Sequence, residues 1–161
     1  MGAARVISKW NGPGTVKVIV ADQDLQPATA AVAAACSAHI EAERPVGPAV
    51  TVEAAGALEV TVEAAAVLDG SASRTGVRDA LEEAVRAYLK SLAAAAFSGN
   101  VDLQLEPLEA GNYEVLFNRI AFLLLSIPGV LDYGTLKLCG GTENLTVPAG
   151  SVPVLKEVRV T

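Results

Sequence analysis

The order of apolar and polar residues in the first third of the chain predicts strands around one helix. Residues 15–20, Thr-Val-Lys-Val-Ile-Val, form a β-branched run that is typical of a strand buried on both faces. An earlier strand is expected near Arg5, and another over residues 49–54. Between them a helix is predicted from Pro27 to about Glu43, because proline is tolerated in a first helical turn and the proline at position 45 ends the helix.

The next segment alternates cleanly and predicts a sheet with one wet face. Residues 58–63, Leu-Glu-Val-Thr-Val-Glu, place their even-numbered side chains on one face and their odd-numbered side chains on the other. A long helix is predicted over residues 75–97, with Gly99-Asn100 as its end. Glu82 and Arg86 are four residues apart on its polar side and are expected to pair. Its predicted apolar face consists of Val77, Leu81, Ala84, Val85, Tyr88, Leu92 and Ala96.

A shorter helix, predicted from Asn112 to Ser126, is unusually apolar. From Ile120 to Leu125 no residue is polar, so the helix must be covered on several sides. Its own sheet or another subunit can provide that cover, and the pattern leaves both open. If a subunit does so, the candidate interface residues are Tyr113, Phe117, Ile120 and Leu124.

Residues 130–139 and 152–161 predict two closing strands. The complete order is β-β-α-β followed by β-α-α-β-β, so the expected fold class is α+β, with helices packed on mainly antiparallel sheets. We expect two domains that divide near Gly56, over residues 1–55 and 56–161.

Composition and charge narrow the classes of function. Val, Leu and Ile are plentiful, which argues against disorder. A net charge of −6 without any basic run argues against nucleic acid and membranes as partners. Two distant cysteines, Cys36 and Cys139, indicate a reducing compartment, and the first residues lack the pattern of a signal peptide. We therefore expect a soluble protein that is made in the cytoplasm.

Several residue groups have the outward form of reactive sites, and each has a plainer structural interpretation. Cys36 and His39 lie three apart on a helix, but a zinc site needs four ligands and Cys36 falls on an apolar stripe. His39 and Glu43 are better read as a surface pair than as parts of a catalytic group. Gly12-Pro13-Gly14 and Gly140-Gly141-Thr142 match neither phosphate-binding glycine motif, so both predict turns.

The acidic pairs are interpreted in the same way. Glu82 and Glu83 are neighbours on a solvated helix face, and Asp22 with Asp24 occupies a turn too short to surround calcium. Asn144-Leu145-Thr146 matches a glycosylation sequon, a pattern that is frequent by chance. Because no polar groups converge, we expect no catalytic residue, no cofactor, no metal and no small-molecule substrate, and hence no enzyme.

Five segments together resemble the baseplate J-like proteins, the wedge proteins of Mu-like and prophage contractile-tail baseplates. The first contains the GPGTV start of a strand, and the last contains the family's closing N…VP…VPVL pattern, although Lys156 stands where glycine is common. Each motif alone is common, but five in the right order are far more specific. The segments are residues 10–20, 44–52, 58–88, 127–130 and 144–155.

The resemblance implies architecture rather than chemistry. It implies a structural component of a contractile phage-tail baseplate that binds other wedge proteins, and copies of itself, during assembly in the host bacterial cytoplasm. The mature location would be the tail baseplate of the virion or of a related injection particle. Roughly the first half of a full-length family member would lie upstream of this chain. Strand edges such as residues 15–20 or 157–161 are candidates for addition to a partner's sheet.

An alternative function remains open at this stage. Split β-α-β units with one wet face also form ferredoxin-like modules that bind small molecules or regulate enzymes. Convergent polar groups in a pocket would favour that module. Neighbouring genes for tail sheath, tube or fibre proteins would favour the baseplate.

Overall fold

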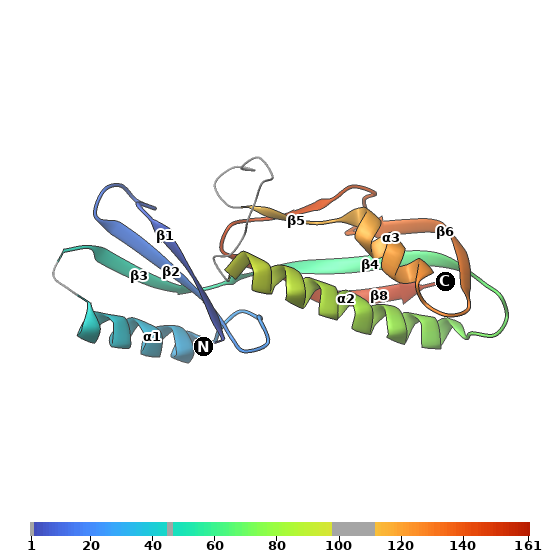
Figure 1. Cartoon of the computed structure of the whole chain (residues 1–161), viewed down its shortest axis with the longest axis horizontal. Helices are drawn as coiled ribbons and strands as arrows, with labels where there is room; N and C mark the ends of the chain where they lie inside the picture. Colours follow the sequence, from blue (N-terminus) through green and yellow to red (C-terminus); the bar gives the residue numbers. More distant parts are fainter. Residues whose placement is uncertain (1, 45–46, 98–111) are drawn as a thin grey trace. The chain divides into compact units, whose positions relative to one another are not determined.

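The computed structural model describes residues 2–44, 47–97 and 112–161, and its architecture is α+β (Figure 1). The described ranges form three helices and eight strands. They divide into two compact units, the first mainly from residues up to Ala57 and the second mainly from Leu58 onward. The predicted fold class is confirmed, with sheets that are antiparallel or mixed. The division into domains 1–55 and 56–161 stays a prediction.

The first unit is a three-stranded sheet with a helix on one face. β1 (Ala3–Ser8), β2 (Thr15–Ala21) and β3 (Ala49–Ala54) lie in the order β1-β2-β3. β1 runs antiparallel to β2, and β3 runs parallel to it. α1 (Ala30–Glu43) links β2 to β3 and packs on one face. The core there consists of Val18, Val20 and Ala28, with Ala4, Val16, Val32, Ala33, Cys36, Ile40, Val50 and Val52 packed against it.

The α1 helix begins three residues later than predicted. Thr29 is its N-cap, and the Thr29 hydroxyl accepts a hydrogen bond from the backbone N–H of Val32 at 3.4 Å. Such a cap satisfies a donor that the first helical turn leaves without a backbone partner, so threonine marks the start. Pro27 instead forms an isolated bridge with Ala21. The predicted stop at Pro45 lies outside the described residues.

β2 lies at the centre of its sheet, so the prediction that residues 15–20 offer a free edge is wrong. Its backbone is already paired on both sides, with β1 and with β3. A β-branched run indicates burial on both faces, but it does not say which strands border it. Residues 157–161 do fall at an edge, because β8 (Ser151–Val160) is the outer strand of the second sheet.

The second unit contains a three-stranded sheet in the order β6-β4-β8. β4 (Gly56–Leu68) is central and pairs antiparallel with β6 (Val130–Leu138), with two register shifts. The predicted alternation over residues 58–63 is confirmed, since Val60 and Val62 are fully buried while the two glutamates of that segment are exposed. One face of this sheet therefore belongs to the core and the other is open.

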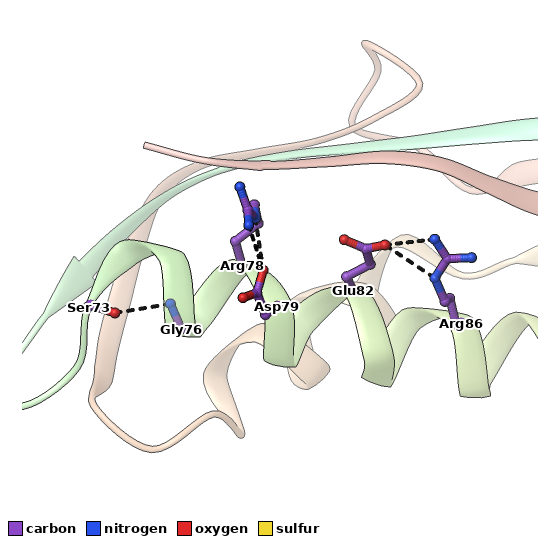
Figure 2. A network of polar contacts seen from close by, with 6 residues as sticks. All are labelled: Ser73, Gly76, Arg78, Asp79, Glu82 and Arg86. Atoms are coloured by element: carbon purple, nitrogen blue, oxygen red, sulfur yellow. Dashed lines mark hydrogen bonds and ion pairs between the residues drawn. The ribbon is translucent and has the colours of Figure 1, made fainter.

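The long helix α2 (Arg74–Phe97) runs along this sheet (Figure 1). The Ser73 hydroxyl accepts the N–H of Gly76 at 3.0 Å, which caps the first turn (Figure 2). The predicted pair of Glu82 and Arg86 is confirmed, with a guanidinium nitrogen 2.6 Å from the carboxylate (Figure 2). The predicted helix end at Gly99-Asn100 lies outside the described residues.

The buried line along α2 differs in part from the predicted apolar face. Val77, Leu81 and Val85 are buried as predicted, but Tyr88 and Leu92 are only half-buried at its flank. Because four residues turn about 40° beyond a full turn, a line that advances by fours winds slowly around the helix. The buried positions that this drift adds are Leu89, Ala93 and Phe97.

The helix predicted from Asn112 is shorter than expected. α3 spans Phe117–Leu125, and the residues before it form the short strand β5 (Tyr113–Val115), which pairs with β7 (Leu145–Val147). Tyr113 and Val115 are buried and Glu114 is not, which is the alternation of a strand. The long-range pairing with β7 decides against a helix there, because a local pattern of three residues suits either structure.

Candidate protein–protein interfaces

The open face of the β6-β4-β8 sheet carries a network of charged side chains. Glu59 and Glu63 lie on β4 beside basic residues of β8. Lys156 pairs with Glu59, and Arg159 lies 3.6 Å from Glu63 and 2.8 Å from Glu157. Every side chain in the network is about half exposed. Exposed ion pairs add little to folding stability. These charged side chains are therefore accessible to a partner protein with complementary charges.

The network also shifts the pKa of several members. The hydrogen bond that Arg159 donates holds the pKa of Glu157 below its usual value, and the same bond raises the pKa of Arg159. The hydrogen bond to Glu59 raises the pKa of Lys156. Lys156, Glu157 and Arg159 therefore keep their charges over a wider pH range than isolated side chains do.

An open depression of about 270 Å³ lies on this charged face. It is lined by Glu63, Ala64, Ala65, Thr135, Lys137, Arg159 and Thr161. Two of its charged groups, Glu63 and Arg159, already pair with one another across the strands. Small-molecule sites are concave and enclose most of their ligand. Because this depression is open and does not enclose a ligand, it offers no particular support for the alternative function as a small-molecule-binding module.

The four residues predicted as an interface do not form one accessible patch. Ile120 and Leu124 have no exposed surface, and Tyr113 is buried at 9% exposure, so these side chains already belong to the core of the second unit. Phe117 is half-buried. The apolar stretch is thus largely covered by the chain itself, and a partner can touch only its outer side. That any of the four contributes to an interface stays a prediction.

The accessible apolar residues of this region are neighbours of the predicted ones. Phe122 and Leu125 are 57% and 44% exposed on the outer side of α3, and Leu131 is 65% exposed on β6. The guanidinium of Arg119 lies 5.3 Å from the centroid of the Phe122 ring, which is a cation–π distance. Leu131 stands at a register shift in the pairing of β6 with β4, and a bulge there leaves it without a cross-strand partner.

A second cluster lies on the first unit, on the sheet face opposite α1. The ammonium of Lys17 lies 4.1 Å from the centroid of the Trp10 ring and 2.9 Å from the Glu53 carboxylate. The Lys17 side chain is only 19% exposed, whereas Glu53 remains 50% exposed. The carboxylate at the end of this stack is therefore the group that a partner can reach.

The residues considered for chemistry lie on different elements of the two units. Cys36 packs against the core of the first unit, His39 is exposed on α1, and Cys139 is exposed at the end of β6. Asp22 closes its turn by accepting the N–H groups of Asp24 and Gln26 at 2.9 and 2.8 Å. In the described ranges, no three His, Cys, Asp or Glu side chains are placed to hold a metal ion. No helix of those ranges is both long and apolar enough to span a membrane.

Asn144 has a structural role that the sequon interpretation missed. Its side-chain oxygen accepts the N–H of Phe117 at 3.0 Å, and its side-chain nitrogen donates to Glu114 at 2.9 Å. Leu116, at the N-cap of α3, has no side-chain cap of its own, and its N–H is accepted by the Tyr88 hydroxyl at 3.1 Å. Residues distant in sequence therefore cap this helix. A local capping motif is absent, so no sequence signal was available.

Two family models match this chain in succession. The baseplate J-like central domain matches residues 1–54, and the baseplate J-like protein C-terminal domain matches residues 60–161. The chain belongs to the baseplate J-like family. The resemblance carried by the five sequence segments is confirmed by these matches. The boundary between the two matched regions of this baseplate J-like chain falls between residues 54 and 60.

The chain is similar to two proteins of Bacillus subtilis (strain 168). It is 28% identical to phage-like element PBSX protein XkdT and 29% identical to the uncharacterized protein YqbT, over 167 residues in each case. Each alignment covers 99% of this chain and 43% of the relative, so the chain spans less than half of their length. Among solved structures, a chain of the anti-feeding prophage baseplate matches with a TM-score of 0.49 and 12% identity, covering 88% of this chain and 29% of that one.

Proposed function

We propose that this chain is a structural component of a contractile-tail baseplate and that it acts by binding neighbouring baseplate proteins. The observation that carries the proposal is the succession of two baseplate J-like domains over residues 1–54 and 60–161. The similarity to a protein of the phage-like element PBSX agrees with a prophage setting.

The surface of the second unit suits assembly with other proteins. Unit two presents a sheet face of exposed ion pairs, and α3 adds the accessible rings and methyl groups of Phe122 and Leu125. Charged faces select partners and orient them, and exposed apolar groups supply contact area. On this proposal the protein is made in the host bacterial cytoplasm and ends in the tail baseplate, beside other wedge proteins.

The test is to locate the protein in intact particles. An antibody raised against the chain would be applied to contractile tails purified after induction of the source bacterium, and the label would be viewed by electron microscopy. We expect label at the baseplate end of the tail, with tails from a strain that lacks the gene as the control. Absence of label from the tails, or label spread along the sheath, would refute the proposal.

A further inference from the structure

The two three-stranded sheets differ in how well their edges are protected against strand addition. In the second unit, β6 carries two register shifts and β8 contains Pro153, and bulges and proline both obstruct a further strand. The described edge strands of the first unit, β1 and β3, have no such features. β1 and β3 pair with β2 in continuous registers of six residues, and neither strand contains proline. Its two edges are therefore regular enough to accept another strand.

The backbone groups that point outward can be assigned at both edges. The N–H of Lys9 donates to the carbonyl of Thr15, so odd-numbered residues of β1 are bonded to β2 and even-numbered residues point outward. On β3, the N–H groups of Ala49 and Ala55 donate toward β2, so its even-numbered residues point outward as well. Both edges thus expose the backbone groups of even-numbered residues.

The same even-numbered residues also share one face of the sheet. Ala4 on β1 and Val50 and Val52 on β3 pack toward the α1 side. Outward-pointing residues form the hydrogen-bonded pairs of an antiparallel ladder, and paired residues lie on the same face. An antiparallel junction between β1 of one copy and β3 of another therefore keeps both α1 helices on the same side of a continuous sheet.

Strand direction agrees with this junction. β1 is antiparallel to β2, and β3 is parallel to β2. If β1 of a second copy runs antiparallel to β3 of the first copy, then β2 of the second copy runs parallel to β2 of the first. The two copies therefore have the same orientation in the sheet. We infer that the first unit associates with a second copy of this chain by pairing β1 with β3 in an extended sheet. The inference rests on the proposed assembly role and names its partner.

Charge selects the register of the junction. When Val6 of one copy faces Val52 of the other, Arg5 stands directly opposite Glu53 on the face away from α1. Among the ion pairs of the described residues none includes Arg5, and Glu53 is half exposed beside Lys17. The junction also covers Val6, which is 65% exposed in the single chain. Moving the register by two residues places Ala3 opposite Glu53 and loses the ion pair.

Such a contact is head-to-tail, because each added copy presents a fresh β3 edge. Contacts of this kind close into rings when the rotation per copy permits, and otherwise they extend as filaments. The junction needs no residue outside the described part of the first unit.

Disulfide trapping tests the register directly. In a background with Cys36→Ala and Cys139→Ser, the Arg5→Cys chain is mixed with the Glu53→Cys chain under mild oxidation. Directly opposed residues of a non-hydrogen-bonded pair have Cβ atoms close enough for a disulfide. We expect a covalent dimer from this mixture. The matched control pairs Arg5→Cys with Val52→Cys, which lie on opposite faces of the junction, and it should give no dimer.

Charge reversal tests the energetics by sedimentation velocity over a concentration series. Arg5→Glu alone and Glu53→Arg alone should each raise the dissociation constant at least about two- to fivefold. The chain that carries both substitutions should associate as tightly as the original chain. Arg74→Glu and Glu83→Arg, on the exposed side of α2, change the net charge equally and should have no effect. Circular dichroism of each variant confirms that the fold is retained.

Two outcomes would overturn the inference. One is a chain that stays monomeric up to about 0.5 mM, where even a millimolar contact populates dimers. The other is association without the disulfide between positions 5 and 53, which would assign self-association to a different surface. Either result leaves the baseplate location to be decided by the labelling experiment, so the two proposals fail separately.

Discussion

The neighbouring leucines at the end of α3 offer a strict test of how the second unit is packed. Leu124 has no exposed surface, whereas Leu125 is 44% exposed. Replacing Leu124 with alanine removes buried methyl groups and leaves a cavity, which costs about 3 kcal/mol of unfolding free energy. Leu125→Ala loses only the buried part of its transfer free energy, about 1 kcal/mol. Both variants replace a leucine with alanine at adjacent positions, so the difference between them reflects burial alone.

The difference of about 2 kcal/mol should appear as a gap of roughly 4–8 °C between the two melting temperatures for a chain of this size. All three tyrosines, Tyr88, Tyr113 and Tyr133, belong to the second unit, so the tyrosine bands of the near-ultraviolet circular dichroism spectrum follow its unfolding. The single tryptophan, Trp10, belongs to the first unit, and its fluorescence reports that unit separately. Equal shifts for the two variants would show that α3 does not bury Leu124 in preference to Leu125.

Three further predictions follow from single contacts in the second unit. Gly129→Ala should lower the free energy of unfolding in urea by about 1–3 kcal/mol, because the φ of Gly129 is +88° and an added Cβ would lie 2.5 Å from Ala72 Cβ. Gly134→Ala is the control, because a Cβ added there meets nothing within 4 Å. Asn144→Ala should cost about 1 kcal/mol by removing the cap on Phe117 and should speed amide hydrogen exchange there, with unchanged exchange counting against the cap. Because the pKa of Glu157 is lowered in the folded protein, its ion pair with Arg159 stabilises the fold fully at pH values above the usual glutamate pKa. This stabilisation is lost as the pH falls through the lowered pKa that Glu157 has in the folded protein. A carboxyl NMR titration should show the Glu157 pKa returning toward its usual value in Arg159→Gln, and no movement would contradict the assigned cause.

Local periodicity was enough to predict much of the second sheet and its long helix. The alternation from Leu58 to Glu63 identified the open face, and the spacing of Glu82 and Arg86 identified their ion pair, because both depend on residues within one strand or one helical turn. The family, too, was readable from short motifs in the right order along the chain.

Long-range pairing decided what local patterns left open. Residues 113–115 became a strand because β7 lies beside them, and residues 15–20 became a central strand because β3 returns next to them. Asn144 became the cap of α3 although it follows that helix by many residues. Each of these outcomes depends on a partner distant in the chain, which no window of neighbouring residues contains.

The candidate interfaces show the same division. Composition made the α3 region apolar on all sides, but only the packed unit separated the buried Ile120 and Leu124 from the accessible Phe122 and Leu125. The sequence alone carries the hydrophobicity of a residue and the period of its neighbours. Which side of a helix faces its own core is set by the sheet against which it packs, and that sheet is assembled from strands far apart in the chain.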